Sequence, residues 1–288
     1  MSNSSLPNLL VIGAMKCGST SLHDYLNQHP DIFMSDTKEL NFFIKESNWD
    51  EGIEWYKNQF KSTALWRGES SISYTKAHEY KGVPDRIYDV LGKDVKLIYL
   101  LRDPIQRFQS NFTDGKTYRD IPPDYSINEY AKIPDNPYLM TSRYAFQLEF
   151  FIKKFSLDQI LVVTTEKLER EPLKVLNEIA DFLDIDHFDD FFVSKTRLNA
   201  SSEKKYKNKT GEQISGSPLI TKFKQLMPSN AIRKVSGSRI YKKLVYNKIN
   251  RELDHLNHES IAILEDYFRD EMDSLRKLTK MQFEDWQV

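Results

Sequence analysis

Short apolar runs alternate with helical patterns along most of the chain, and this alternation predicts the fold. Each run is bounded by glycine or polar residues, which is typical of strands buried on both faces of a parallel sheet. Strands are predicted at residues 9–13, 64–69, 95–101 and 160–165. Apolar positions that recur every three or four residues predict helices at residues 52–60, 84–91, 142–155, 172–183 and 259–278. The order predicts an α/β fold with a central parallel β-sheet flanked by helices on both faces, as a single domain over residues 1–288.

The turn after the first predicted strand carries a glycine-bounded motif. The spacing from Gly13 to Gly18, followed by Ser19 and Thr20, nearly matches the G-x4-G-K-[ST] motif, so the sheet is predicted to be P-loop-like. The first amides of the next helix have no partner inside it and point into the turn, which predicts an anion cradle. The lysine stands inside the loop, at Lys16, where it can meet a phosphate-like group but not as an NTPase lysine does. The alternative is an ordinary strand-to-helix turn.

A second anion site is predicted after the strand at 95–101. Arg102 follows that strand directly, and Pro104 opens a helix that also carries Ser110. Ligands of open α/β sheets bind at the carboxyl ends of the strands, where Arg102 stands. The alternatives are a surface pair between Arg102 and Asp103, or Asp103 as a magnesium ligand. A long irregular loop, typical of a lid or binding edge, is predicted at 114–137.

The segment at residues 35–43 carries a charged pair followed by aromatic residues. Lys38 and Glu39 precede Leu40, Phe42 and Phe43. This arrangement predicts a loop held beside the core, and the alternative is a solvated turn.

Composition narrows the class of protein. The 288 residues are 40% hydrophobic and 29% charged, with a net charge of −1, which are globular values. The single cysteine, Cys17, excludes an internal disulfide framework, and it is interpreted as a small residue in a tight turn or as a reactive thiol. Without a signal peptide or a long apolar run, a soluble, cytoplasmic protein is expected. Histidines such as His23, His29 and His78 are expected at the surface, and no zinc-type spacing occurs.

Residues 203–251 form a basic segment. They include thirteen lysines and arginines and two glutamates, a net charge of +11 in a chain of −1. A basic stretch attracts anions, so acidic substrates, nucleotides, nucleic acid or a lipid surface are candidate partners. The alternative is a solvated insertion.

Four motifs together resemble one family. Residues 16–22, 38–43, 52–56 and 101–112 are similar, in order and spacing, to sulfotransferases that use 3′-phosphoadenosine 5′-phosphosulfate (PAPS), especially the heparan sulfate branch and its bacterial relatives. The resemblance implies a loop that binds the 5′-phosphosulfate, made of Lys16, Cys17, Gly18, Ser19, Thr20 and Ser21. It implies a 3′-phosphate pair, Arg102 and Ser110, and a nucleotide-closing segment that includes Lys204 and Lys205.

The same resemblance implies the chemistry. Glu39 matches the glutamate taken as the general base, Lys16 would assist the departing phosphate, and no metal is required. Asn41 and Ser70 depart from the family pattern, which often has His and Lys at those positions. The implied acceptor is a hydroxyl or amine, with a carbohydrate favoured and a lipid or small natural product as alternatives. Acceptor and oligomeric state do not follow from the sequence.

Two other classes stay open. A P-loop nucleoside or small-molecule kinase would need a lysine after Gly18 and an acidic metal ligand. A basic membrane-surface or nucleic-acid binding protein would use residues 203–251 but would leave Lys16, Glu39 and Arg102 without a role. We favour the sulfotransferase, with peripheral contact to an anionic membrane or an anionic glycan as the predicted use of the basic segment.

Overall fold

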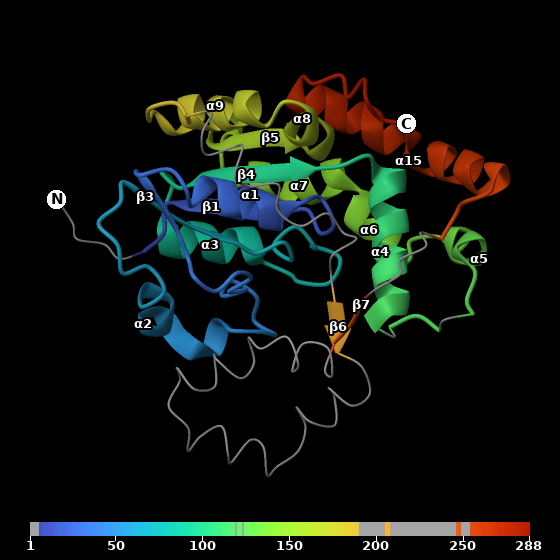
Figure 1. Cartoon of the computed structure of the whole chain (residues 1–288), viewed down its shortest axis with the longest axis horizontal. Helices are drawn as coiled ribbons and strands as arrows, with labels where there is room; N and C mark the ends of the chain where they lie inside the picture. Colours follow the sequence, from blue (N-terminus) through green and yellow to red (C-terminus); the bar gives the residue numbers. More distant parts are fainter. Residues whose placement is uncertain (1–5, 119, 123, 190–204, 208–245, 249–253) are drawn as a thin grey trace, which may run out of the picture. The chain divides into compact units, whose positions relative to one another are not determined.

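Five parallel strands form the central sheet in the computed structural model, which describes residues 6–118, 120–122, 124–189, 205–207, 246–248 and 254–288. The strand order is β2-β3-β1-β4-β5. Their bounds are Leu9–Gly13 (β1), Ile32–Met34 (β2), Trp66–Ser70 (β3), Lys96–Leu101 (β4) and Ile160–Thr164 (β5). Figure 1 shows these strands in the middle of the first part of the chain, with helices around them. The predicted α/β fold with a P-loop-like parallel sheet is confirmed.

The helices lie along the sheet and at its edges. They are α1 (Ser19–Leu26), α2 (Gly52–Lys57), α3 (Val83–Leu91), α4 (Pro104–Tyr118), α5 (Ile127–Ala131), α6 (Pro137–Ser142), α7 (Tyr144–Ile152), α8 (Thr165–Arg170), α9 (Pro172–Leu183) and α15 (His258–Thr279). Two short 3₁₀ helices are η1 (Trp49–Glu51) and η2 (Leu157–Gln159). Helix α1 packs on β1, β2 and β3, α9 packs on β5, and α15 packs on α4, α5 and α7.

The strand order creates a natural ligand crevice. From β1 the chain runs to the far edge at β2, returns through β3, and then crosses to β4 on the other side of β1. The connection from β1 therefore leads to one side of the sheet and the connection from β3 leads to the other, which makes the neighbouring strands β1 and β4 the switch point; because all the strands are parallel, their carboxyl ends lie at one edge. Ligands bind at such a switch point in open α/β sheets. The motifs at residues 16–22 and 101–112 begin at the ends of β1 and β4, and the motif at 38–43 follows β2 and is bonded to the end of β3.

Burial explains why these strands form. Leu9, Leu10, Val11 and Ile12 of β1 are fully buried, as are the five residues from Leu97 to Leu101 of β4. Strands covered on both faces need such continuous apolar runs, because neither face meets water. The apolar pattern in the sequence therefore identified the central strands directly.

Two sequence-based expectations need correction. The strand β2 is absent from the predictions because it has only three residues and is defined by its register with β3, where Phe33 lies opposite Arg67. The loop predicted at 114–137 is partly helical, because α4 continues to Tyr118 and α5 lies within that range. Contacts from distant residues explain the extra helical turn, including a 2.6 Å ion pair between Lys116 and Asp254.

The chain divides into two compact units, residues 1–196 with 253–288, and residues 197–252. The sheet and all the helices named above belong to the first unit. In the second, β6 (Lys205–Lys207) pairs in antiparallel fashion with β7 (Tyr246–Lys248). The predicted organisation, one domain over residues 1–288 with a basic lid at 203–251, stays a prediction.

Candidate active site

The loop between β1 and α1 is fixed by contacts from the neighbouring strand and helix. The amide of Ala14 donates to the carbonyl oxygen of Leu100 at 2.6 Å. The hydroxyl oxygen of Thr165, at the start of α8, lies 2.7 Å from the carbonyl oxygen of Cys17 and 2.8 Å from that of Leu101. The loop is thereby tied to the carboxyl end of β4, at the switch point of the sheet.

The backbone conformation of this loop opens the start of α1. Gly18 precedes the helix with a left-handed φ of 83°, and no side chain caps the helix there. Lys16 also has a positive φ, of 70°. Because the first amides of a helix lack intrahelical acceptors, the end of α1 carries partial positive charge suited to an anion. The predicted cradle therefore has the required backbone geometry.

Cys17 belongs to the loop, but its side chain points into the core and not toward the cradle. Its side chain is fully buried, with its sulfur 3.9 Å from the hydroxyl oxygen of Tyr144. Burial raises the pKa of the Cys17 thiol to about 12, so the thiol is protonated at neutral pH. Of the two interpretations of Cys17, the structure favours the small residue that fills a tight turn.

Arg102 and Ser110 share one face of the segment that follows β4. The guanidinium of Arg102 donates to the side-chain oxygen of Gln106 at 3.2 Å. Gln106 and Ser110 are four residues apart on α4 and therefore lie on the same side of the helix. Arg102 and Ser110 are both half-buried. The predicted pair of anion-binding residues is thus compatible with one site.

Asp103 has a structural role that differs from both predicted alternatives. It is fully buried, which excludes a surface pair with Arg102. Its two carboxylate oxygens accept hydrogen bonds from the amides of Gln106 at 2.9 Å and Gln287 at 2.6 Å. The first bond caps the start of α4, and the second attaches the C-terminal segment. Backbone amides occupy both oxygens that a magnesium ion would need.

Arg107 is a functional candidate that is not among the predicted site residues, although it lies beside them in the sequence. Its side chain is fully buried, and burial lowers its pKa, although arginine stays protonated in proteins. It donates to the hydroxyl of Ser142 at 2.5 Å, to the carbonyl oxygen of Tyr138, and to that of Met15 at 3.5 Å. The Met15 contact places a buried positive charge directly behind the cradle. Its spacing from Arg102 is visible in the sequence, but its burial is not.

The loop that carries Glu39 is pinned to the end of β3. The amide of Glu39 donates to the carbonyl oxygen of Ser70, and the amide of Asn41 donates to the hydroxyl of Ser71, both at 2.9 Å. The amide of Leu40 donates to the carboxylate of Glu69. Glu39 and Asn41 both have a positive φ, of 62° and 47°. These three successive bonds stabilise a backbone that L-residues rarely adopt.

The Glu39 side chain points away from the core. Its side chain is 40% exposed and accepts a 2.8 Å hydrogen bond from Lys38. Leu40, Phe42 and Phe43 beside it are buried, so the loop is held against the core as predicted. A carboxylate on a fixed backbone with an accessible head group is suited to accept a proton from a bound molecule.

Glu69 is the buried counterpart of Glu39. Its carboxylate accepts hydrogen bonds from Tyr56 and Tyr74 at 2.7 Å and from Ser71 at 2.5 Å. Burial raises the pKa of Glu69, and the bonds from these hydroxyls oppose that rise. With no exposed surface and several donors, this carboxylate holds the Glu39 loop and does not reach a ligand.

The expectation that His23 and His29 lie at the surface is wrong. Both are buried, and each ring finds polar partners inside the protein. Nδ1 of His23 lies 2.9 Å from the hydroxyl oxygen of Ser70, and Nε2 lies 3.2 Å from the carbonyl oxygen of Ser35. Desolvation lowers the pKa of His23, so the neutral ring connects α1 to the loop after β2 and the end of β3. Ser70, at a position where lysine was expected, completes this connection.

Several predicted features are not tested by the structure. Lys204 and most of the basic segment lie outside the described residues, and Lys205 begins β6 in the second unit. Their role at the nucleotide stays a prediction. Among the residues described, no cluster of three or more histidine, cysteine or acidic side chains could hold a metal ion. No described helix is both long enough and apolar enough to span a membrane.

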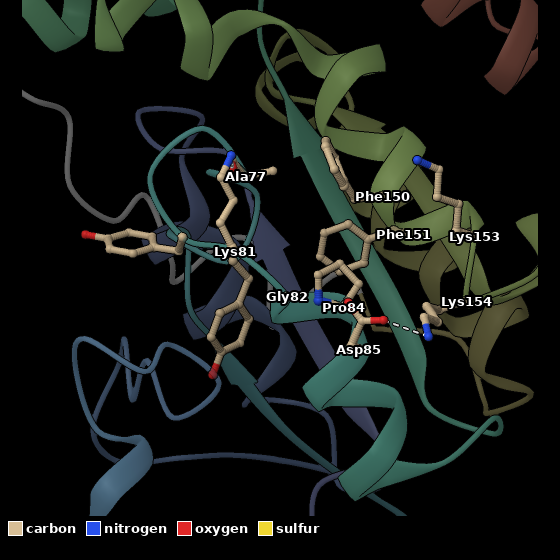
Figure 2. Close-up of a pocket in the computed structure, with 11 residues that line it drawn as sticks. Ala77, Lys81, Gly82, Pro84, Asp85, Phe150, Phe151, Lys153 and Lys154 are labelled. Atoms are coloured by element: carbon tan, nitrogen blue, oxygen red, sulfur yellow. Dashed lines mark hydrogen bonds and ion pairs between the residues drawn. The ribbon is translucent and has the colours of Figure 1, made fainter.

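A small pocket lies away from these residues. Its volume is about 90 Å³. Figure 2 shows it between the segment at 74–85 and the helix α7. The 2.6 Å ion pair between Lys154 and Asp85 lies beside it, and Phe151 forms part of its wall. None of the predicted site residues lines this pocket. This pocket is therefore not the candidate active site. We place that site at the carboxyl edge of β3, β1 and β4, where the predicted residues lie.

Comparisons with known proteins identify the family of the chain. Residues 6–276 match the model of the family described as "Sulfotransferase domain". A human heparan sulfate glucosamine 3-O-sulfotransferase 5 is 31% identical over 197 residues, a match covering 62% of this chain and 54% of that protein. A bifunctional heparan sulfate N-deacetylase/N-sulfotransferase 1 from Caenorhabditis briggsae is 29% identical over 209 residues, covering 65% of this chain and 24% of that protein. The chain thus spans about half, or less, of these relatives.

A solved structure supports the fold. The crystal structure of a sulfotransferase from Alicyclobacillus acidocaldarius superposes with a TM-score of 0.66 and 20% identity, covering 98% of this chain and 99% of that one. At this identity the likeness concerns the fold alone.

Proposed function

Because the chain belongs to the sulfotransferase family, whose domain model matches residues 6–276, we propose that it transfers a sulfuryl group from PAPS to an acceptor. The observation that carries this proposal is the meeting of two anion-binding features at one sheet edge. The cradle with Lys16 follows β1, and the face with Arg102 and Ser110 follows the adjacent strand β4. PAPS carries two anionic groups, a 5′-phosphosulfate and a 3′-phosphate, so each of these two features has one anionic group to bind.

Donor binding relies on charge and backbone amides. In the proposal, the amides at the start of α1 and the ammonium of Lys16 bind the 5′-phosphosulfate, and Arg102 with Ser110 binds the 3′-phosphate. The buried charge of Arg107 adds favourable potential behind the cradle. These groups supply countercharge without a metal, so we expect donor binding to be independent of magnesium.

The reaction is proposed to be an in-line displacement at sulfur. The acceptor oxygen or nitrogen forms a bond to sulfur while the bond from sulfur to the phosphate oxygen breaks. Glu39 takes the acceptor's proton, and Lys16 with the helix amides stabilises the negative charge that develops on the departing phosphate. The fixed backbone of the Glu39 loop supports this role, because a positioned base requires a defined approach to the acceptor.

The acceptor is proposed to be a carbohydrate hydroxyl or amine. The support is that the two relatives named above are both heparan sulfate sulfotransferases, one acting at a 3-O position and one named for N-sulfation. The basic segment at 203–251 is proposed to attract an anionic acceptor or an anionic membrane surface. A cytoplasmic location is part of the same proposal.

Calorimetry with three ligands separates the sulfotransferase from the two other classes. Adenosine 3′,5′-bisphosphate, ATP and a short oligonucleotide would be titrated into the protein with EDTA and again with magnesium. We expect the bisphosphate to bind in EDTA and ATP to bind at least about tenfold more weakly, a difference of about 1.4 kcal/mol. Magnesium-dependent ATP binding without bisphosphate binding would favour the kinase. Binding of the oligonucleotide alone would favour the nucleic-acid binding protein.

A further inference from the structure

The predicted donor lysine already has an anionic partner inside the protein. The ammonium of Lys16 forms an ion pair with a carboxylate oxygen of Asp114 on α4. The two side chains are only 13% and 18% exposed, so water screens this pair less than a surface pair. No local pattern in the sequence links Asp114 to Lys16, because 98 residues separate them.

The position of Asp114 on α4 connects the two parts of the proposed donor site. Gln106, Ser110 and Asp114 follow one another at intervals of four residues and share one face of the helix. Arg102 contacts Gln106 at one end of this row, and Lys16 contacts Asp114 at the other. Asp114 is therefore a carboxylate in a row of side chains that otherwise offers cationic and neutral groups to the donor.

A carboxylate at this position has a definite electrostatic consequence. It neutralises the charge that the cradle would offer to a phosphosulfate, and it repels an approaching anion. Lys16 has a single ammonium group on a flexible stem, so a strong contact with the donor competes with its contact to Asp114. Binding of the donor should then exchange one anionic partner of Lys16 for another.

We propose that Asp114 is an exchangeable counter-ion of Lys16, which holds the ammonium when the donor site is empty, yields it to the phosphosulfate, and recovers it when the bisphosphate leaves. This inference rests on the proposed function, because it takes Lys16 as a donor-binding residue. The exchange lowers the affinity for donor and product alike, and it accelerates product release. Asp114 is therefore a positioning residue that sets the lifetime of the bisphosphate complex.

The test compares bisphosphate binding in Asp114→Asn and Asp120→Asn. Asp114→Asn keeps the shape of the side chain and removes its charge, so we expect bisphosphate affinity to rise about five- to twentyfold. Most of that gain should appear as slower dissociation in stopped-flow displacement with a fluorescent bisphosphate analogue. Asp120→Asn removes the same charge from an exposed position six residues further on and should change affinity less than about twofold.

Further variants separate failure of this inference from failure of the proposed function. Lys16→Met and Arg102→Ala should each weaken bisphosphate binding by about tenfold or more, and Asp114→Glu, which keeps the charge, should stay near wild type. If both cation variants lose affinity while Asp114→Asn binds no more tightly than wild type, the exchange is wrong and the donor site stands. Equal gains in Asp114→Asn and Asp120→Asn would also overturn it, since they would reflect net charge alone. Unchanged binding in both cation variants would refute the donor site itself. Thermal unfolding of every variant checks that it is folded.

Discussion

The donor edge and the Glu39 loop are built in opposite ways. The proposed donor edge consists of the ends of regular elements, β1 with α1 and β4 with α4, where the first amides of each helix lack acceptors inside the helix. The Glu39 loop has no regular structure, and its positive φ values are maintained by bonds from the end of β3. The comparison teaches that the proposed donor site is encoded largely by local sequence, whereas the placement of the proposed base, Glu39, depends on distant side chains.

This difference predicts which variants change binding and which change turnover. Substitutions at the donor edge should alter the affinity for the nucleotide, because its groups are proposed to contact the donor before and during the reaction. Substitutions in or beneath the Glu39 loop should alter kcat with little change in nucleotide affinity, because they act on the acceptor's proton. The predictions below test this separation, from the largest expected effect to the smallest.

Glu39→Gln should produce the largest effect. It keeps the shape of the side chain and removes its ability to accept a proton, so kcat should fall by about 100-fold or more. The affinity for adenosine 3′,5′-bisphosphate should remain near wild type. Steady-state kinetics and calorimetry on the same preparation measure the two quantities. Turnover at a tenth of the wild-type rate or higher would exclude Glu39 as the base.

Arg102→Ala should give the opposite pattern. Loss of a charge-assisted bond to the 3′-phosphate should weaken bisphosphate binding by about 1.5–3 kcal/mol, or roughly 10- to 150-fold. Adenosine 5′-monophosphate, which lacks the 3′-phosphate, serves as the control ligand and should bind both proteins equally. Equal losses for the two ligands would indicate that the substitution disturbs the fold and not a 3′-phosphate contact.

Glu69→Gln should lower kcat about tenfold, because the amide of Leu40 loses its anionic acceptor and the Glu39 loop is less well fixed. The free energy of unfolding should also fall, by about 1–3 kcal/mol. Tyr56→Phe is the matched control, since it removes one donor to Glu69 and leaves the bond to Leu40 in place. The control should lose stability and keep its kcat. If kcat falls equally in both variants, the effect reflects stability and not positioning.

His23→Gln should have the smallest effect, and only at acidic pH. Burial lowers the pKa of His23 below its usual value of about 6.5, so the unfolded chain binds the proton more readily. The contribution of this neutral histidine to the free energy of unfolding is fully present above the usual pKa of about 6.5. It is lost as the pH falls below that value, with a slope of at most about 1.4 kcal/mol per pH unit. Urea unfolding from pH 8 to pH 5 should therefore show a shallower decline for His23→Gln than for wild type. Parallel curves would contradict the buried neutral ring.

The comparison also explains what the sequence could predict. The central strands β1 and β4 follow from apolar runs because burial on both faces requires them. The predicted cradle follows from glycine spacing because the motif is contiguous. The strand β2 is too short to show a periodic pattern. The last turn of α4 is not visible in the sequence, because it is supported by an ion pair between Lys116 and the distant residue Asp254. The burial of His23 is not visible either, because the polar partners of its ring lie on other elements.

The residues of the candidate site fall into two groups, those that the sequence identifies and those that only the structure identifies. Lys16, Arg102 and Glu39 are identified by motifs and by a family resemblance, so their residue types are visible in the sequence. The residues that support them are not, because Arg107, Glu69 and Asp114 are recognised only through contacts made across the fold. A charged residue in a sequence is normally a solvated one, and nothing local marks the exception.

Transfer of labelled sulfate tests the central claim most directly. The protein would be incubated in EDTA with PAPS carrying radiolabelled sulfate and a panel of glycan acceptors, and label in the acceptor would be compared with bisphosphate released. The account predicts acceptor labelling with one bisphosphate formed per sulfate transferred, and loss of both signals in Glu39→Gln. No labelling of any acceptor from PAPS, together with phosphate transfer from magnesium-ATP, would contradict it.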